Sequence, residues 1–331
     1  MTPKVVAVVG ATGAVGAEFL KVLEDRNFPI KSLKLLASAR STGKKLKFKG
    51  QELPVEELGP NSFKGVEVAL FSAGAQRSKD FAPIAVKAGA IVVDNSSAFR
   101  MDEGIPLIVP EVNADVIKTH KGIIANPNCS TIQMVVAINP IHKEANIERV
   151  VVATYQAASG AGAEAMQELI DTTRHALEGK KVTPKKFLQQ IAFNLFPHID
   201  VFLENGYTKE EMKMVHETRK IMRAPNIQVT ATCVRVPVLR AHSEAINLTT
   251  TRKISAARAR EILSKAPGVK VLDNPAKNEY PMPILASGGY DTWVGRIRED
   301  ISQKNGIDLF CSADQLLKGA AFNAVQIAEL L

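Results

Sequence analysis

Cys129 stands in a sequence context that could make its thiol a nucleophile. It follows Asn128 within the segment Asn126–Thr131 and directly precedes an apolar pattern with helical spacing. At the N-terminus of a helix the macrodipole stabilises a thiolate, and the pKa falls below its free value of about 8.5. Cys233 and Cys311 instead lie in strand-like apolar runs, which predicts inert packing sulfurs. Taken alone, Cys129 also fits a buried structural thiol, so its assignment depends on the rest of the chain.

A glycine-rich turn near the N-terminus could hold a dinucleotide. Residues Val5–Val9 are apolar like a buried strand, and Gly10, Gly13 and Gly16 follow before a helical pattern. Backbone N–H groups at such a helix N-terminus bind pyrophosphate, and glycines allow its close approach. The spacing is G-x-x-G-x-x-G rather than G-x-G-x-x-G, so the turn alone also fits one that binds nothing. The strand before it and the helix after it favour the dinucleotide site.

The loop after the second predicted strand indicates which dinucleotide would bind. An NAD site places an acidic residue here for the ribose hydroxyls, whereas the segment Ala37–Lys44 contains none. It holds Arg40, Ser41 and Thr42 instead, and a guanidinium flanked by hydroxyls suits a 2′-phosphate. An ordinary basic surface loop is the alternative. The loop therefore favours NADP over NAD.

The thiol and the glycine turn belong to two parts of the chain whose sequence patterns predict different kinds of β-sheet. Over the first 126 residues, short β-rich runs alternate with helical patterns, as in a parallel α/β sheet. The predicted strands there are Val5–Val9, Leu33–Ala37, Val66–Phe71, Ile91–Val93, Ile105–Val109 and Ile123–Ala125, with helices after the first strand and near Phe81–Lys87. This order predicts a doubly wound sheet.

From about Asn128 onward the predicted strands are longer and cluster together, which indicates a mostly antiparallel or mixed sheet. They are Arg149–Ala157, Val229–Val236, Ala245–Thr251, Asp291–Arg298 and Ile307–Cys311, and helices are predicted at Glu164–Leu177 and Ala256–Lys265. A last helix is predicted to start with Ser312, with Gln315 in capping-box spacing.

The composition is that of an ordinary globular protein. Of 331 residues, 46% are hydrophobic and 23% are charged, and no apolar run reaches the ~20 residues that span a bilayer. No signal peptide is recognised, three scattered cysteines exclude a disulfide framework, and no histidine pair has zinc spacing. These features predict a cytoplasmic protein without a metal. The net charge of +8 comes from scattered Lys and Arg residues, so nucleic-acid binding is a weak interpretation.

Seven short segments, in order along the chain, match one enzyme family. They are GATGAVG at Gly10–Gly16, SSAFR ending at Arg100, NPNCST around Cys129, YQAASGAG from Tyr155, HETRK from His216, CVRVPVLRAHSEAI from Cys233, and GAAFNAVQIAE from Gly319. Together they resemble aspartate-semialdehyde dehydrogenases over essentially the full length of the chain. The related N-acetyl-glutamyl-phosphate reductases and glyceraldehyde-3-phosphate dehydrogenases carry catalytic segments resembling NPGCYPT and SCTTN, which NPNCST does not fit well.

The resemblance implies that L-aspartyl 4-phosphate is reduced with NADPH to L-aspartate 4-semialdehyde and phosphate, in lysine, threonine and methionine biosynthesis. Cys129 would form a thioester with the acyl group. His242, seven residues after Arg235, would transfer protons. Gln156 would orient the acyl intermediate, and Asn128 would donate an amide hydrogen beside the nucleophile.

The resemblance also implies binding residues. Arg235 would hold the substrate carboxylate and Glu217 the amino group, while Arg100 and Lys220 would hold phosphate. Together with the Arg40 loop, the cofactor contacts would be Gly10, Thr12, Gly13, Ala14, Val15, Gly16, Arg40, Ser41, Thr42, Ser159, Gly160 and Asn323. Without the resemblance, Glu217 and Lys220 fit a solvated helix face and Arg100 fits a loop cation.

The expected fold is therefore α/β, with a Rossmann-type NADP-binding domain at 1–127 that is completed by a C-terminal helix at 313–331. An α+β catalytic and dimerisation domain with a mixed sheet would occupy 128–312. The partners expected are the small-molecule substrate and further copies of the chain, as a dimer or tetramer, with no nucleic acid and no membrane. A related reductase of N-acetyl-glutamyl-phosphate type and a non-catalytic NADP-binding redox sensor remain alternatives, and the presence of all four proposed reaction residues argues against the sensor.

Overall fold

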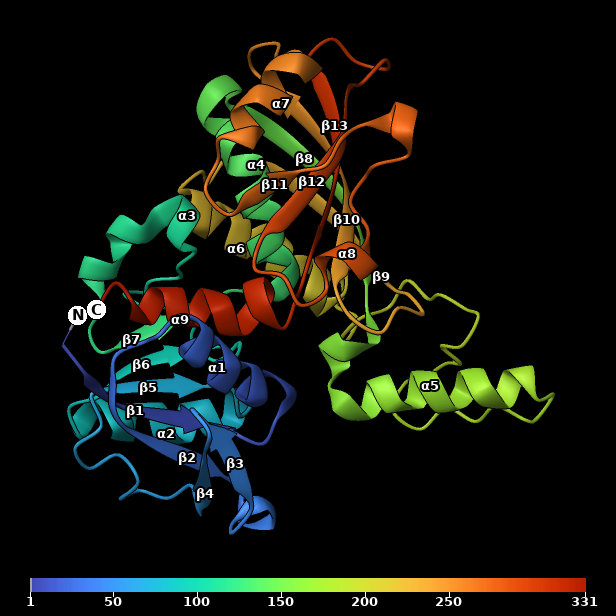
Figure 1. Cartoon of the computed structure of the whole chain (residues 1–331). Helices are drawn as coiled ribbons and strands as arrows, with labels where there is room; N and C mark the ends of the chain where they lie inside the picture. Colours follow the sequence, from blue (N-terminus) through green and yellow to red (C-terminus); the bar gives the residue numbers. More distant parts are fainter. Residues whose placement is uncertain (1) are drawn as a thin grey trace. The chain divides into compact units, whose positions relative to one another are not determined.

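The computed structural model describes residues 2–331 and divides into two compact units, each built around its own β-sheet (Figure 1). One unit comprises the chain up to Asn128 together with Gly319–Leu331, and the other comprises Cys129–Lys318. No helix in the described part of the chain is both long and apolar enough to cross a membrane.

The first unit is a seven-stranded sheet with helices around it. Its strands are β1 (Lys4–Val9), β2 (Ile30–Ala37), β3 (Lys45–Phe48), β4 (Gln51–Glu57), β5 (Val68–Phe71), β6 (Ile91–Asp94) and β7 (Ile123–Ala125). Its helices are α1 (Ala14–Asp25), α2 (Ala75–Lys87), α3 (Pro110–Asn113) and α9 (Phe322–Ala328), with 3₁₀ turns at Ala39–Ser41 and Ala114–Thr119.

These strands lie in the order β3-β4-β2-β1-β5-β6-β7, and all neighbours are parallel except the hairpin of β3 and β4. From β1 the chain continues to β2 on one side of the sheet, and the later strands β5, β6 and β7 are added on the other side. Open α/β sheets bind ligands at the point between β1 and β5 where this change of side occurs. The predicted doubly wound sheet is confirmed.

The turn from β1 into α1 requires glycine at two positions. Gly10 has a φ of +87°, and a Cβ there would lie 2.3 Å from the carbonyl oxygen of Ser72. A Cβ on Gly16 would lie 2.2 Å from the carbonyl oxygen of Gly10. The backbone of this turn therefore lies so close to the start of α1 and to the segment after β5 that no side chain would fit between them.

The second unit contains one mixed sheet. Its strands are β8 (Ile147–Gln156), β9 (Gln228–Arg235), β10 (His242–Thr250), β11 (Val269–Val271), β12 (Thr292–Glu299) and β13 (Gly306–Ala313). Its helices are α4 (Cys129–Ala145), α5 (Ala163–Leu177), α6 (Lys209–Met222), α7 (Ala256–Ser264) and α8 (Pro283–Ala286), with 3₁₀ turns at Ala158–Ala161 and Pro275–Lys277. The strand order is β11-β12-β13-β10-β8-β9, with β8 and β9 parallel and β10 antiparallel to β8.

Helices α4, α6 and α7 pack against this sheet and enclose its core, while α5 extends to its side (Figure 1). Val150 and Val152 of β8 are buried in that core, whereas the alternating Val151 and Ala153 are partly exposed and Tyr155 is 38% exposed. Because strand side chains alternate between faces, the other face of the sheet is left open in the chain itself.

The sequence predicts one strand that the structure does not form, and it misses other elements. The strand predicted at Ile105–Val109 is wrong, because only Leu107 makes an isolated bridge there, to Ala125. Pro106 and Pro110 lack the N–H donors that a strand ladder needs. The hairpin of β3 and β4 and the helix α6 were not predicted.

The capping box predicted for the last helix is also wrong. Ser312 lies inside β13, where its hydroxyl donates to the carbonyl oxygen of His242 over 3.3 Å. Oδ1 of Asp314 instead accepts the N–H groups of Leu316 and Leu317, at 3.0 and 3.2 Å. A π-helical turn at Leu317–Ala321 then leads into α9.

Candidate active site

Three of the predicted site residues meet at one edge of the second sheet because of strand direction. Gln156 and Arg235 end the parallel strands β8 and β9 and stand opposite each other in register. His242 begins the antiparallel strand β10. All three side chains are buried. The topology therefore gathers groups that are far apart in the sequence.

Cys129 is the first residue of α4, as its sequence context predicts. It is partly exposed, whereas Cys233 and Cys311 are fully buried. Burial lowers the pKa of Arg235, and the negative charges of Glu210 and Cys129 oppose that effect. A thiolate at Cys129 thus lies within electrostatic range of the Arg235 guanidinium.

His242 presents one ring nitrogen to the backbone and one to the site. Its Nδ1 accepts a hydrogen bond from the N–H of Ala157 over 3.0 Å. Burial, and then the positive charge of Arg235, lower the pKa of His242 well below its usual value of 6.5. Among the described residues no group hydrogen-bonds to its buried Nε2. The neutral ring therefore carries its proton on Nε2, where it is available to a ligand.

Gly160 lies against both His242 and Arg235. A Cβ at this position would be 3.0 Å from Nε2 of His242 and 3.2 Å from Nη1 of Arg235. The neighbouring Ser159, which the resemblance also links to the cofactor, is buried, and its hydroxyl accepts a hydrogen bond from Gln315. The segment thus packs tightly behind the two ionisable groups.

The Arg235 side chain reaches past the end of the sheet. Its Nη1 donates to the carbonyl oxygen of Ala157 over 2.6 Å, and the guanidinium lies 5.8 Å from the ring centroid of Phe187. Cys233 precedes it on the same face of β9, but its sulfur points into the core towards Met214. Because β9 ends at Arg235, one strand face can hold both a buried thiol and a cation at the site.

The Gln156 amide is held at both ends. Its Oε1 accepts from the hydroxyl of Thr154 over 2.9 Å, and its Nε2 donates to Oε1 of Glu210 over 3.2 Å. Glu210 is not among the residues that the sequence predicts for the site. The capping-box spacing of Thr208 and Glu211 is a signal that could have located the start of α6, and Glu210 with it.

The two residues predicted on α6 are differently exposed. Glu217 is only 1% exposed, and Lys220, one turn further, is partly exposed. The interpretation of this segment as a fully solvated helix face is therefore wrong for Glu217. Helix α6 packs against β9 and α4, which carry Arg235 and Cys129.

The first unit holds the remaining predicted substrate residues. Arg100 is buried and donates to the carbonyl oxygens of Asn126 and Asn95, at 2.9 and 3.1 Å. Asn128 is also buried. Nδ2 of Asn323 donates to the carbonyl oxygen of Ile108 and to Oδ1 of Asn126, so this amide group ties α9 to the strands of its own unit.

The predicted cofactor residues of the first unit lie in two adjoining turns. Thr12 and Gly13 are exposed, Ala14 and Val15 begin α1, and the hydroxyl of Thr12 donates to that of Ser41 over 3.1 Å. Ser41 belongs to the 3₁₀ turn Ala39–Ser41, in which Arg40 is exposed, and Thr42 follows it. The glycine turn and the basic loop are therefore neighbours.

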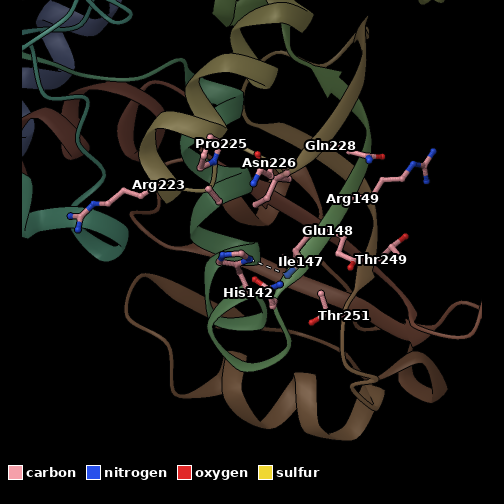
Figure 2. A pocket seen from close by; sticks show the side chains of 13 residues that line it. His142, Ile147, Glu148, Arg149, Arg223, Pro225, Asn226, Gln228, Thr249 and Thr251 are labelled. Carbon is pink, nitrogen blue, oxygen red and sulfur yellow. Dashed lines mark hydrogen bonds between the residues drawn. The ribbon is translucent and has the colours of Figure 1, made fainter.

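A surface cleft of about 740 Å³ lies at the opposite end of the second sheet. It is lined by residues that begin β8 and β9, among them Arg149 and Gln228, and by His142 of α4. Figure 2 shows Arg149 and Arg223 pointing away from each other, and His142 bonded to the backbone of Ile147. None of the predicted site residues lines this cleft.

Comparisons with known proteins identify the family. The model of the semialdehyde dehydrogenase NAD binding domain matches residues 5–120, and that of the semialdehyde dehydrogenase dimerisation domain matches residues 138–318. The chain is 60% identical to aspartate-semialdehyde dehydrogenase of Aquifex aeolicus (strain VF5), over 98% of this chain and 97% of that protein. It is 54% identical to the Bacillus subtilis (strain 168) enzyme, over 98% and 96%.

Solved structures of aspartate-semialdehyde dehydrogenases also match this chain. Aspartate semialdehyde dehydrogenase II of Vibrio cholerae, complexed with ASA, has a TM-score of 0.97 and 48% identity and covers 100% of this chain and 98% of its own. The Candida albicans enzyme with NADP has a TM-score of 0.76 and 28% identity, covering 100% and 98%. The resemblance and the fold class predicted from the sequence are confirmed. With full-length relatives at this identity, and with an NAD-binding domain model followed along the sequence by a dimerisation domain model, the chain belongs to the aspartate-semialdehyde dehydrogenase family.

Proposed function

We propose that this protein reduces L-aspartyl 4-phosphate to L-aspartate 4-semialdehyde and phosphate with NADPH, through a thioester on Cys129. The observation that carries the proposal is the edge of the second sheet, where Gln156, Arg235 and His242 are gathered, together with α4, which begins at Cys129 and packs against β8 and β10. The product would feed lysine, threonine and methionine synthesis. A reducing cytoplasm suits the thiol chemistry.

The first half of the reaction is acyl transfer. The thiolate of Cys129 attacks the acyl carbon, a C–S bond forms, and the C–O bond to phosphate breaks. Arg100 and Lys220 are proposed to bind the phosphate, since two cations match a leaving dianion. Arg235 is proposed to hold the substrate carboxylate, with Glu217 at the amino group.

The second half is reduction of the thioester. When bound, NADPH supplies a hydride to the acyl carbon. His242 then gives its Nε2 proton to the developing oxyanion, which the orientation of its ring supports. The negative charge passes to the ring as an imidazolate, on which the positive charge of Arg235 acts until the proton returns. When the thiohemiacetal collapses, the C–S bond breaks, the aldehyde leaves, and the proton on its hydroxyl returns to His242. The Cys129 thiolate is regenerated.

The first unit fits the proposed cofactor. Gly10 and Gly16 leave no room for a side chain, so a pyrophosphate could approach the backbone at the start of α1. Gly13 is the N-cap of α1 and has no side chain to occupy the first N–H groups. The neighbouring exposed Arg40 would pair with the 2′-phosphate, which favours NADP over NAD.

A phosphate-dependent assay tests the function. The purified protein should reduce NADP with aspartate semialdehyde only when phosphate is present, and more efficiently than with aldehydes of longer chain. A preference for a longer aldehyde would favour the related reductase type. Binding of NADPH without any turnover would favour the non-catalytic redox sensor.

We further propose that two copies pair through the open face of the second sheet. Tyr155 is 38% exposed there, and its ring centroid lies 6.2 Å from that of Phe310. A hollow of about 330 Å³ lined by Val151, Ala153 and Ala245 adjoins them. The dimerisation model covers these strands, which supports a second copy as the occupant. Light scattering of Ala245→Arg should give the monomer mass if this face is the interface, and an unchanged oligomer would place the interface elsewhere.

A further inference from the structure

Glu210 sits between the proposed acyl-binding amide and a second ion pair. It is 5% exposed and is the second residue of α6. One carboxylate oxygen accepts from Nε2 of Gln156 over 3.2 Å, and the other lies 2.9 Å from Nζ of Lys213. Nζ of Lys213 lies in turn 2.8 Å from Oδ2 of Asp200. The buried carboxylate is therefore engaged on both of its oxygens.

Glu210 decides which way round the Gln156 amide lies. The Thr154 hydroxyl can donate or accept, so it is compatible with either end of the amide. An ionised carboxylate can only accept, so the NH₂ group must face Glu210 and the carbonyl oxygen must face Thr154. A neutral amide in place of Glu210 would remove this constraint.

The position of Glu210 is fixed by its own helix. The hydroxyl of Thr208 accepts the N–H of Glu211, whose side chain in turn accepts the N–H of Thr208. The same Glu211 side chain accepts the N–H of Cys233 over 2.9 Å. The start of α6 is thus hydrogen-bonded to β9, the strand that ends in Arg235.

The charged and titratable groups that face Glu210 come from four elements. Lys213 lies on its own helix, Asp200 on the preceding loop, and Cys233 and Arg235 on β9. Strand β8 contributes the neutral side chains of Thr154 and Gln156. Helix α4 contributes Cys129, whose negative charge acts on the Arg235 guanidinium, as that of Glu210 does. The negative charge of Glu210 opposes the lowering of the Arg235 pKa by burial. Lys213 favours the ionised form of Glu210.

We propose that Glu210 is a positioning residue that must be ionised, because it orients the Gln156 amide and balances Arg235, and that Lys213 keeps it ionised. The inference rests on the proposed function, in which Gln156 and Arg235 bind the acyl substrate. It assigns a role in the reaction to a carboxylate and a lysine that would contact neither substrate nor cofactor.

The first test compares Glu210→Gln with Glu210→Asp. Glu210→Gln should lower kcat on the order of 100-fold, as expected when a reacting group is slightly misplaced, while KM for NADPH stays unchanged. Glu210→Asp keeps the charge and should recover part of the loss. A wild-type kcat in Glu210→Gln would overturn the proposal, and so would equal losses in the two variants.

The second test uses the pH dependence of kcat/KM in Lys213→Met. Without the Lys213 ammonium group, the buried Glu210 carboxylate takes up a proton at a higher pH. The acid limb of the kcat/KM profile should therefore move to higher pH. In the double variant Glu210→Gln/Lys213→Met, the acid limb should stay where it is in Glu210→Gln alone, because residue 210 can no longer titrate. Lys209→Met, an exposed neighbour on the same helix, is the matched control. An acid limb that does not move in Lys213→Met would overturn the proposal even if the Glu210 variants fail to fold.

The assay of the wild-type protein separates this inference from the proposed function. Phosphate-dependent turnover by the wild type supports the function whatever the Glu210 variants do. If the wild type turns over and Lys213→Met behaves like Lys209→Met, only the role of Glu210 is wrong. If the wild type shows no turnover with aspartate semialdehyde, the function and the inference that depends on it both fail.

Discussion

The backbone N–H of Ala157 donates a hydrogen bond to Nδ1 of His242, and this contact of 3.0 Å fixes the tautomer of a buried ring. Because the pKa of His242 is lowered by burial and by Arg235, the ring is neutral near pH 7. A neutral ring that accepts at Nδ1 carries its proton on Nε2. His242 can therefore donate a proton in its resting state and accepts one only after donation.

Replacing His242 by Asn should remove this donor. We expect kcat to fall by ~10²- to 10⁴-fold, the range for a positioned acid or base, with NADPH affinity nearly intact. His142→Asn is a matched control, because Nδ1 of His142 also accepts a backbone N–H, from Ile147 over 3.0 Å. It lies in the cleft at the other end of the sheet (Figure 2). Similar kcat values for the two variants would exclude a proton-transfer role for His242.

Gly160→Ala should disturb two groups of the site with one methyl. Its Cβ would lie 3.0 Å from Nε2 of His242 and 3.2 Å from Nη1 of Arg235, so both side chains must move by a few tenths of an ångström. We expect kcat to drop by up to about 100-fold, because reacting groups tolerate little displacement. The melting temperature should change little. Gly59→Ala, whose Cβ meets nothing within 4 Å, controls for the loss of glycine, and equal kcat values would contradict the prediction.

The sequence predicts those parts of the structure whose conformation depends on residues that are close together in the chain. The apolar run Val5–Val9 and the glycines after it form β1 and the turn into α1, because the short-range constraint is the missing Cβ itself. Cys129 begins α4, as the helical spacing of the apolar residues that follow it predicts.

Long-range contacts decide what the sequence could not predict. Ser312 has the spacing of a helix cap, but its strand is buried and pairs with β10, which leaves the cap to Asp314. Glu210 looks like any charged residue at a helix start. It belongs to the site only because α6 packs on β9 and brings the carboxylate to Gln156.

Cys129 should react faster with iodoacetamide than either other cysteine. Cys233 and Cys311 are fully buried, and burial raises the pKa of both thiols, so few thiolates are available there. Peptide mapping after brief alkylation should find the label on Cys129, and bound aspartate semialdehyde should protect it. Cys129→Ala and Cys129→Ser should both lose turnover. Equal labelling of the three cysteines would argue against a reactive Cys129.

Glu244 should make the stability of the protein depend on pH. Burial raises its pKa well above the usual 4.5, although hydrogen bonds from Cys311 and Gln133 oppose this. The native state therefore keeps a proton that the unfolded chain releases above pH 4.5, and the free energy of unfolding falls as pH rises towards the native pKa. Glu244→Gln cannot titrate, so it should show a smaller fall in melting temperature from pH 4.5 to neutral pH.

Calorimetry across that range checks the prediction for Glu244. The exposed Glu148→Gln on β8 removes the same charge from the surface and should leave the slope unchanged. Parallel curves for wild type and Glu244→Gln would mean that this carboxyl does not hold a proton in the native state.

Arg40 should control the choice between NADPH and NADH. If its guanidinium pairs with the 2′-phosphate, Arg40→Ala should weaken NADPH binding by roughly 1.5 kcal/mol, or about 10-fold, the lower end for charge-assisted hydrogen bonds because the residue is exposed. NADH lacks this phosphate and should be almost unaffected. Higher salt should narrow the preference of the wild type, since the Debye length is only ~10 Å at 0.1 M.

The reverse substitution tests the same contact by repulsion. Arg40→Asp should repel the 2′-phosphate and offer a carboxylate to the free ribose hydroxyls, so the preference should move towards NADH. The hydroxyl of Thr12 donates to Ser41 beside this turn, which places the loop next to the glycines where the pyrophosphate would bind. The measurement is kcat/KM for each cofactor in the wild type and both variants, with the exposed Lys31→Ala on β2 as the charge control. Equal losses for NADPH and NADH in Arg40→Ala would make Arg40 a structural loop residue and remove the physical basis for choosing NADP.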